Sequence, residues 1–417
     1  MESSVSNAAI DKLSPTLPLT AEQERLVQQI LQFCKDHLKD NNPAVFTIYG
    51  DAGTGKSVVL SHLFASLQLA ARTQPDSPFY KSNNYFTVNH PEILKVYREL
   101  AGKQQHQYKK DYQRPTSLIN RLDKEGKDVD VVIVDEAHLL LSKPDHYNNF
   151  YHQNQLVELL HHAKVVVLVF DQFQVLRMKS LWTPKRLQKI TNRYPHAEYH
   201  LHHQFRMTAS DELLDWFNQL TESRIIKQLP ISARDHYDFR IYDDAEAMHQ
   251  AIVRRNQEVG LSRILSTSGY PSTLDGGKHY IDEGHFHLPW DQYNFTSTPW
   301  AEIPKTINEV GSIYTCQGFD LNYAGIIMGP IIFQIPGTKQ IDIDFGKYTD
   351  TESLKRRDDL TDPKEIKELK YKMILNALNV ILKRGVRGTY IYAHDPLLRK
   401  TLYQMFIKRG WGDVLAK

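Results

Sequence analysis

Apolar residues gather in short uninterrupted runs along the first half of the chain, and each run ends in glycine or in polar residues. The runs are AVFTIY at 44–49, VDVVIV at 129–134 and AKVVVLVF at 163–170. Runs of this length with almost no alternation are typical of strands that are buried on both faces of a parallel sheet. The pattern therefore predicts an α/β fold for this half.

The second half of the chain repeats the mixture of helical and strand patterns. An amphipathic helix is expected around Leu213, Leu214, Trp216 and Phe217, and AGIIMG at 324–329 reads as a strand. A further helix in NALNVILKR leads through a glycine turn into the strand TYIYA. This alternation indicates a second domain after a first one.

Between the first strand and the helix that follows it lies Gly50-x-x-x-x-Gly55-Lys56-Ser57, the pattern of a phosphate-binding loop. Glycines let backbone N–H groups curl around phosphate oxygens, while Lys56 reaches the β- and γ-phosphates and the Ser57 hydroxyl ligates Mg²⁺. The alternative interpretation is an ordinary glycine turn between a strand and a helix.

Two other strand ends carry polar side chains where ligands of parallel sheets bind. Asp135 suits Mg²⁺, directly or through water, and Glu136 suits the general base that orients an attacking water. Asp171 and Gln174 can sense the γ-phosphate of ATP. Capped turns at the strand ends are the alternative in both places.

Two further stretches have two interpretations each. Thr20 and Gln23 form the pattern of a helix capping box, but the Gln23 amide can instead hydrogen-bond adenine. In the basic turn from Lys383 to Gly388, Arg384 and Arg387 both qualify as an arginine finger that faces a phosphate held by another domain. The alternative for this turn is a solvated loop.

Composition narrows the class of protein. The chain has 417 residues with 24% charged residues and a net charge of +2, too mild to indicate a nucleic-acid partner by itself. Two cysteines cannot form a disulfide framework, and no run of 18 apolar residues indicates a membrane span. We therefore expect a cytoplasmic protein with no membrane partner, and we interpret residues 1–17 as a flexible tail.

The motifs also resemble a known family. TAEQ, GDAGTGKS, VDEAH, FDQFQ, HHQFR, TCQGFD and LKRGVRG occur in this order, and together they resemble the ATPase core of superfamily 1 DNA/RNA helicases. The stretches VNHPEILKVYREL, RPTSLIN, VGSIYTCQGFDLNYAGIIMGP and NVILKRGVRGTYIY make the chain similar to the Schlafen group 3-like DNA/RNA helicase domain, a bacterial family of unknown function. The resemblance extends over most of the chain.

The resemblance implies an α/β fold of two tandem RecA-like P-loop domains with parallel central sheets, with ATP and Mg²⁺ in the cleft between them. In the first domain Gln23 would contact adenine, Asp135 and Glu136 would serve Mg²⁺ and water, and Gln174 would contact the γ-phosphate. The triphosphate would be held by a loop of eight residues: Gly50, Asp51, Ala52, Gly53, Thr54, Gly55, Lys56 and Ser57.

In the second domain the resemblance implies that Arg206 and Arg384 reach the γ-phosphate, that Gly318 lies near the phosphates and that Asp320 lies near the ribose. Two positions depart from the superfamily pattern: Phe170 stands in place of glycine, and Lys383 in place of threonine. The expected domains span 18–199 and 200–417, with a charged surface insertion near 333–370.

These observations predict an ATP-dependent motor that binds single-stranded DNA or RNA, with strand separation left open. Basic stretches with aromatic residues at 107–115 and 182–189, together with the turn near Arg387, are candidate contacts to nucleic acid. A second hypothesis is a nucleotide-gated switch or assembly ATPase that acts on a protein partner. A nucleotide kinase fits less well, because it would not need Arg206 in a second domain.

Overall fold

A computed structural model of the chain describes residues 10, 13–50, 53–201, 207–272, 277–292, 294, 296, 298–316 and 319–412. The chain divides into two compact units, Met1–Phe205 and Arg206–Lys417. The last strand of the first sheet continues to Leu201, past the expected domain boundary at residue 199. Most of the N-terminal tail expected at 1–17 lies outside the described residues.

The first unit is built on a parallel sheet of six strands in the order β3-β2-β4-β5-β1-β6. Each pair of neighbouring strands runs parallel, and Val131 of β4 pairs with Val165 of β5. The central strands β4 and β5 are the two valine-rich runs of the sequence, and almost all of their residues are buried. The strands are β1 (Ala44–Gly50), β2 (Asn84–Val88), β3 (Tyr112–Gln113), β4 (Val129–Asp135), β5 (Ala163–Phe170) and β6 (His196–Leu201).

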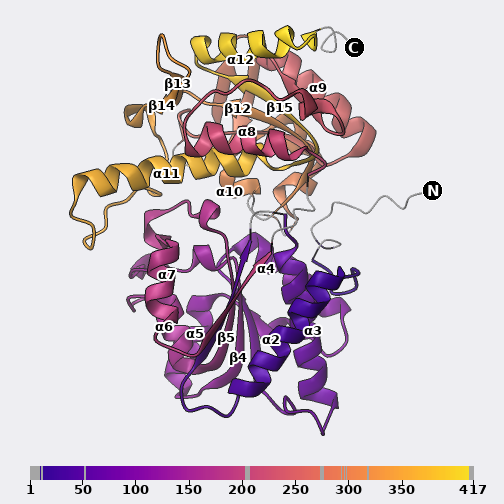
Figure 1. Ribbon diagram of the computed structural model, residues 1–417, viewed down its shortest axis with the longest axis vertical. Helices are drawn as coiled ribbons and strands as arrows, with labels where there is room; N and C mark the ends of the chain where they lie inside the picture. Colours follow the sequence, from indigo (N-terminus) through magenta and orange to yellow (C-terminus); the bar gives the residue numbers. More distant parts are fainter. Residues whose placement is uncertain are drawn as a thin grey trace. The chain divides into compact units, whose positions relative to one another are not determined.

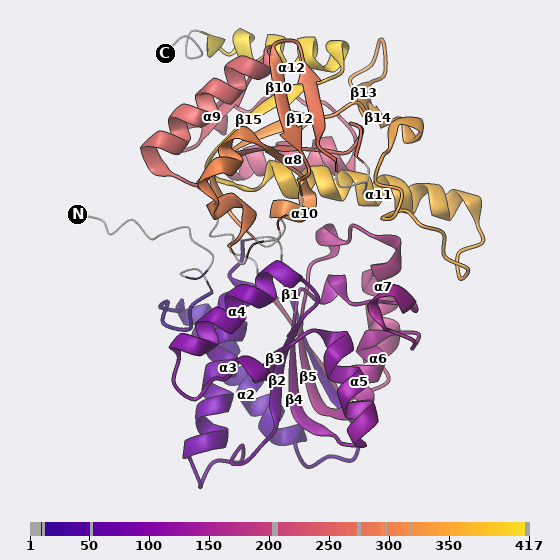
Figure 2. The same ribbon diagram turned by 180° about the vertical axis from the view of Figure 1, so that it is seen from behind.

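Helices cover both faces of this first sheet. Helices α2 and α3 lie on one side of it, and α5 and α6 lie on the other (Figures 1 and 2). The helices are α2 (Ala21–His37), α3 (Lys56–Thr73), α4 (Pro91–Lys103), α5 (Pro115–Glu125), α6 (Gln155–His162) and α7 (Pro184–Thr191). Three of them, α4, α5 and α7, begin with proline, whose fixed φ and missing N–H suit the first turn of a helix.

The second unit has its own sheet, in the order β7-β15-β12-β8-β11-β10-β9. Its neighbouring strands run parallel except for the antiparallel pair β9 and β10 at one edge. The strands are β7 (Asp238–Ile241), β8 (Ser262–Ser266), β9 (His279–Glu283), β10 (Phe286–Trp290), β11 (Val310–Gly311), β12 (Leu321–Met328) and β15 (Gly385–Ala393). A separate hairpin joins β13 (Ile332–Gln334) to β14 (Ile341–Ile343).

Two hydrophobic cores lie on the two faces of this second sheet. One joins apolar residues of the sheet to α8, α11 and α12, and the other joins them to α9 and the hairpin of β9 and β10. The helices are α8 (Asp211–Glu222), α9 (Ala245–Val259), α10 (Ile313–Cys316), α11 (Pro363–Leu382) and α12 (Pro396–Lys408). The protein therefore consists of two tandem RecA-like α/β domains with parallel central sheets, as the sequence predicted.

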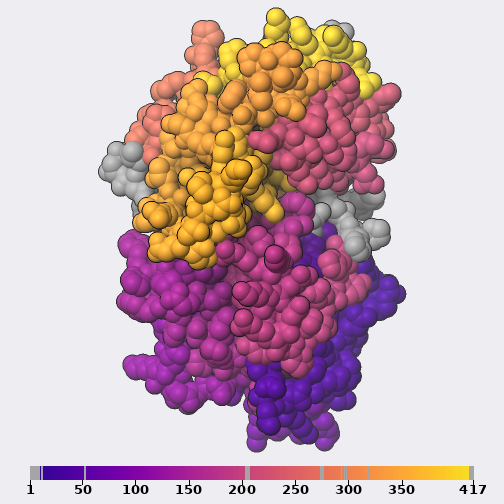
Figure 3. Space-filling view, turned by 60° about the vertical axis from the view of Figure 1, so that its left-hand side comes forward, coloured from indigo at the N-terminus to yellow at the C-terminus, as the bar shows by residue number. Residues whose placement is uncertain are grey.

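The segment expected as a surface insertion, 333–370, is only partly at the surface. Ile341 and Ile343 of β14 are buried in the core that contains α8 and α11. From residue 361 to Lys370 the chain is mostly exposed and includes the first turns of α11, and Figure 3 shows this part in orange to yellow on the surface. Among the described residues, no helix combines the length and apolar character needed to span a membrane.

Candidate active site

The phosphate-binding loop lies where the sequence placed it, between the carboxyl end of β1 and the amino end of α3. Gly53 and Gly55 have φ of 90° and 78°, in the left-handed region that favours glycine, and Gly55 is the N-cap of α3. The first N–H groups of α3 therefore have no side-chain cap and can bind an anion. Asp51 and Ala52 lie outside the described residues.

Lys56, the first residue of α3, is almost fully buried. Its Nζ donates to the carbonyl oxygen of Gly50 at 2.6 Å and lies 3.6 Å from Oδ2 of Asp171. Asp171 directly follows β5, and β5 is the neighbour of β1 in the sheet. The sheet order therefore brings the loop lysine and the tip of the next strand together.

Asp171 also accepts two hydrogen bonds, from the backbone N–H of Phe173 at 3.0 Å and from Nε2 of Gln174 at 2.8 Å. Burial by itself would raise the pKa of Asp171, but the charges of Lys56 and His138 and these hydrogen bonds lower it below the ordinary value. Asp171 is therefore an anion that holds both Lys56 and Gln174. The two residues expected to sense the γ-phosphate form one connected group with the loop.

A second carboxylate, Asp135, ends β4 and faces Ser57. The Ser57 hydroxyl donates to its Oδ1 at 3.3 Å, and the Tyr97 hydroxyl donates to its Oδ2 at 2.7 Å. Burial, followed by the charge of Glu136, raises the pKa of Asp135 to about 6. A cation beside this buried carboxylate would stabilise its charged form and lower the pKa again.

The residues present fit a magnesium ion. Ser57 and Asp135 offer oxygen ligands side by side, and Mg²⁺ usually takes one or two protein oxygens and completes its shell with water and substrate phosphates. The described part of the chain contains no cluster of three His, Cys, Asp or Glu side chains suited to a metal.

Glu136 has an unusual backbone conformation, with φ of 52° and ψ of 49°, where non-glycine residues are uncommon. Its Oε2 lies 3.0 Å from Nε2 of His138, which is completely buried in the short 3₁₀ helix Ala137–Leu139. The strained backbone and the imidazole together orient the carboxylate expected to act as general base.

Sequence reasoning missed His138 and Tyr97 as parts of this site. His138 had a usable signal, because it follows the two acids at the end of a buried strand. Tyr97 had none: it lies on α4 among apolar residues, and only the fold brings its hydroxyl to Asp135.

Gln23 forms the capping box at the start of α2, and its side-chain amide also lies beside the phosphate-binding loop. Its backbone N–H donates to the Thr20 hydroxyl, and its Oε1 accepts from the backbone N–H of Thr20 at 3.0 Å, so the capping box is confirmed. Its Nε2 lies against the loop, only 2.3 Å from where a Cβ on Gly55 would be. The amide donor therefore lies beside the phosphate-binding loop, where a nucleotide would bind.

In the second unit, Asp320 and Arg384 lie close together because they precede the neighbouring parallel strands β12 and β15. Arg384 is only 1% exposed. Its Nη1 donates to the carbonyl oxygen of Phe319 at 3.1 Å and lies 3.9 Å from Oδ1 of Asp320. Arg206 and Gly318 lie outside the described residues.

A glycine-rich loop at the carboxyl end of a parallel strand, with a lysine, a serine and acidic strand ends around it, defines the class of P-loop domains. The chain belongs to the Schlafen group 3, DNA/RNA helicase domain family, whose model matches residues 43–395. It is 40% identical over 426 residues to "Uncharacterized protein YPL245W" of Saccharomyces cerevisiae, covering 95% of this chain and 93% of the yeast protein.

Solved structures with a related arrangement include two Pif1 helicases. One, from Candida albicans, is 13% identical with a TM-score of 0.37, covering 90% of this chain and 95% of that chain. The other, from Bacteroides in complex with ADP-AlF3 and ssDNA, is 12% identical with a TM-score of 0.32, covering 94% and 98%. The family assignment rests on the family match over residues 43–395 and on the yeast relative.

Proposed function

We propose that this protein is an ATP-dependent nucleic-acid motor of the superfamily 1 type, which hydrolyses ATP held by its two RecA-like domains. The observation that carries the proposal is the convergence of Lys56, Ser57, Asp135 and Glu136 at the carboxyl ends of β1 and β4. The family, described as a DNA/RNA helicase domain, supports nucleic acid as the partner.

In the first domain the loop and the amino end of α3 would bind the phosphates through backbone N–H groups. Lys56, whose ammonium group lies 3.6 Å from the Asp171 carboxylate, would leave this contact and bind the β- and γ-phosphates instead. Ser57 and Asp135 would hold Mg²⁺, which when bound neutralises charge on the phosphates.

The attacking water would be oriented by Glu136, which His138 holds in place. Gln174 would contact the γ-phosphate, and its hydrogen bond to Asp171 would couple that contact to the end of β5. Gln23 would donate its Nε2 hydrogen bond to adenine while its Oε1 continues to cap α2. Each of these roles uses a side chain that the fold already orients.

The second domain would supply positive charge to the same phosphate. Arg384 and Arg206 are the proposed sources, with Gly318 near the phosphates and Asp320 near the ribose. The proximity of Arg384 to Asp320 supports a shared role for the two. ATP would then favour one arrangement of the domains and its hydrolysis another, which changes the grip on a single strand.

The test is ATP turnover measured as phosphate release, with and without single-stranded DNA or RNA. A motor is stimulated strongly by one or both, and the stimulation falls steeply with added salt because phosphate contacts release counterions. Turnover that does not respond to either oligonucleotide contradicts the motor and supports a nucleotide-gated switch that acts on a protein partner.

We place this activity in the cytoplasm. Cys34 and Cys316 are both buried and free, as expected in a reducing compartment. Fractionation of cells that express a tagged chain tests the placement, and recovery in a secreted or membrane fraction would contradict it.

A further inference from the structure

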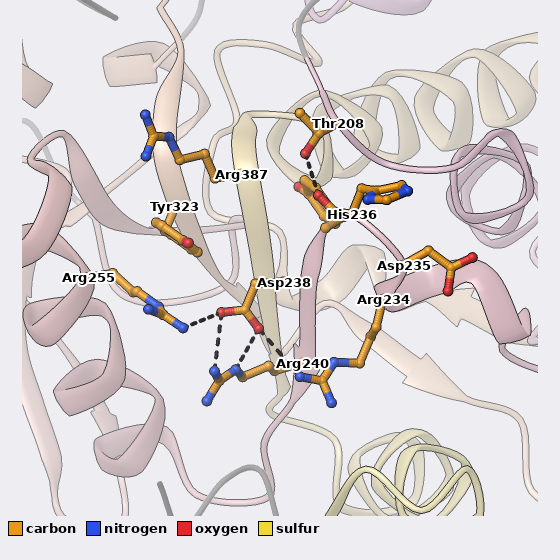
Figure 4. Close-up of a pocket in the computed structure, with 10 residues that line it drawn as sticks. Thr208, Arg234, Asp235, His236, Asp238, Arg240, Arg255, Tyr323 and Arg387 are labelled. Atoms are coloured by element: carbon orange, nitrogen blue, oxygen red, sulfur yellow. Dashed lines mark hydrogen bonds and ion pairs between the residues drawn. The ribbon is translucent and has the colours of Figure 1, made fainter. Parts of the chain in front are cut away.

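The second domain contains an open pocket of about 520 Å³, and none of the residues in the proposed ATP site line it. Arg387, which the sequence offered beside Arg384 as a candidate arginine finger, lines this pocket instead. It lies at the amino ends of three neighbouring strands, where Asp238 of β7, Gly388 of β15 and Tyr323 of β12 are paired in register. Figure 4 shows that arginine side chains from several elements surround Asp238. A pocket of this size can hold a nucleotide.

Gly388 of β15 is the register partner of two residues that line the pocket, Asp238 and Tyr323. A Cβ at this position would lie 2.6 Å from the carbonyl oxygen of Asp238 and 2.7 Å from the Tyr323 ring. A side chain at position 388 would therefore push Asp238 and Tyr323 apart.

Three guanidinium groups share the single carboxylate of Asp238. Arg240 donates to both of its oxygens, at 2.8 and 3.2 Å, and Arg255 donates to Oδ2 at 2.7 Å. Nη2 of Arg234 lies 3.9 Å from Oδ1. The Tyr390 hydroxyl also donates to Oδ2, at 2.6 Å. Asp238 therefore holds the arginines in place but cannot neutralise all three.

The remaining charges around the pocket leave it positive. Arg255 has a second partner in Glu258, at 2.7 Å, on the exposed side of α9. The carboxylate of Asp235 is directed away from Asp238 (Figure 4). A fourth arginine, Arg387, is exposed, and among the described residues it has no hydrogen-bond or ion-pair partner. This region thus contains four guanidiniums and three carboxylates, and only the carboxylate of Asp238 lies among the arginines.

An aromatic ring lies beside these cations. The Arg255 guanidinium is 5.0 Å from the centre of the Tyr323 ring, and Tyr323 and Arg387 are neighbours in Figure 4. Arginines that bind phosphate oxygens, next to a ring or guanidinium plane on which a base can stack, are the usual means of binding a nucleotide without reading its sequence.

We propose that this pocket binds the phosphate group of a nucleotide unit through Arg387 and Arg255, with the base against Tyr323. The nucleotide comes either from a single strand or from the free pool. The strand as source rests on the proposed function, whereas the pocket's affinity for phosphate does not. The pocket is then a second phosphate site, separate from the loop of the first domain in sequence and in residues.

The experiment measures binding of a fluorescein-labelled single-stranded oligonucleotide of about 16 nucleotides to the full chain by anisotropy, without ATP. Arg387→Ala is expected to weaken binding about tenfold and to reduce the slope of log affinity against log salt by about 1. Arg387→Lys restores part of the affinity because it keeps the charge. Arg254→Ala is the matched control, since Arg254 is exposed on α9 but does not line the pocket.

A second arm identifies a free nucleotide as the source. Fluorescent ADP is titrated into the Lys56→Ala chain, whose loop lysine is missing, with and without Arg387→Ala. Binding that depends on Arg387 in this arm alone identifies a free nucleotide, and dependence in the oligonucleotide arm identifies a strand.

The proposal is overturned if Arg387→Ala and Arg254→Ala bind both probes alike. It is also overturned if the full chain does not bind the oligonucleotide and the Lys56→Ala chain does not bind ADP. Thermal unfolding checks the fold, and an exposed arginine without partners should leave the melting temperature unchanged. Failure of the motor appears separately, as ATP turnover that oligonucleotide does not stimulate.

Discussion

The ammonium group of Lys56 lies 3.6 Å from the carboxylate of Asp171, and both side chains are almost fully buried. Replacing Lys56 with alanine removes the proposed phosphate contact and also leaves Asp171 without this cation. We expect turnover to fall at least about a hundredfold and the free energy of unfolding to fall by about 1–3 kcal/mol. Phosphate release and chemical denaturation measure the two effects.

The double variant Lys56→Ala/Asp171→Asn separates the two roles. It removes the unpaired buried charge, so stability should recover while turnover stays lost. Turnover at the wild-type rate by Lys56→Ala would refute the site, and a double variant less stable than the single one would refute the pairing.

Glu136→Gln should abolish hydrolysis while leaving ATP binding within a few-fold of wild type. The amide keeps the size of the side chain but cannot take a proton from water. Single-turnover kinetics and titration with a fluorescent ATP analogue measure the two properties. Asp130→Asn, near the amino end of the same strand, is the control and should hydrolyse normally. Equal loss in both variants would point to damage of β4 rather than to a general base.

Gln23→Glu distinguishes helix capping from adenine recognition. Glutamate at this position still caps the helix, because its oxygen can accept from the Thr20 N–H. It has no amide donor beside Gly55, so preference for ATP over GTP should fall while the melting temperature stays constant. Gln23→Ala should lose both the preference for ATP and the side-chain cap of α2. If Gln23→Glu keeps the wild-type preference for ATP, Gln23 is a cap alone.

Arg384→Ala should lower turnover about a thousandfold, in the range reported for arginine fingers, with a much smaller change in ATP affinity. Because Arg384 is buried, Arg384→Lys is measured beside it: it keeps the positive charge but not the planar fork. We expect Arg384→Lys to unfold near the wild-type temperature and still to hydrolyse slowly. Full activity in the folded lysine variant would exclude Arg384 from the reaction.

Much of the first domain could be read from local patterns. The strands β1, β4 and β5 end at Gly50, Asp135 and Phe170, each within one residue of the end of its apolar run. In the second domain the sequence did not reveal that part of 333–370 is buried. Ile341 and Ile343 are single apolar residues in a charged segment, and only the fold packs them into the core with α8 and α11.

By itself, the sequence determined the chemistry at each strand end and the glycine loop, since burial of a strand and the conformation of a turn depend on neighbouring residues. Only the tertiary structure decided which ends meet. The order β4-β5-β1 brings Asp171 to Lys56 and Asp135 to Ser57, and the register of β7, β15 and β12 assembles the arginine pocket around Asp238. Such pairings join residues far apart in the chain, and no local periodicity encodes them.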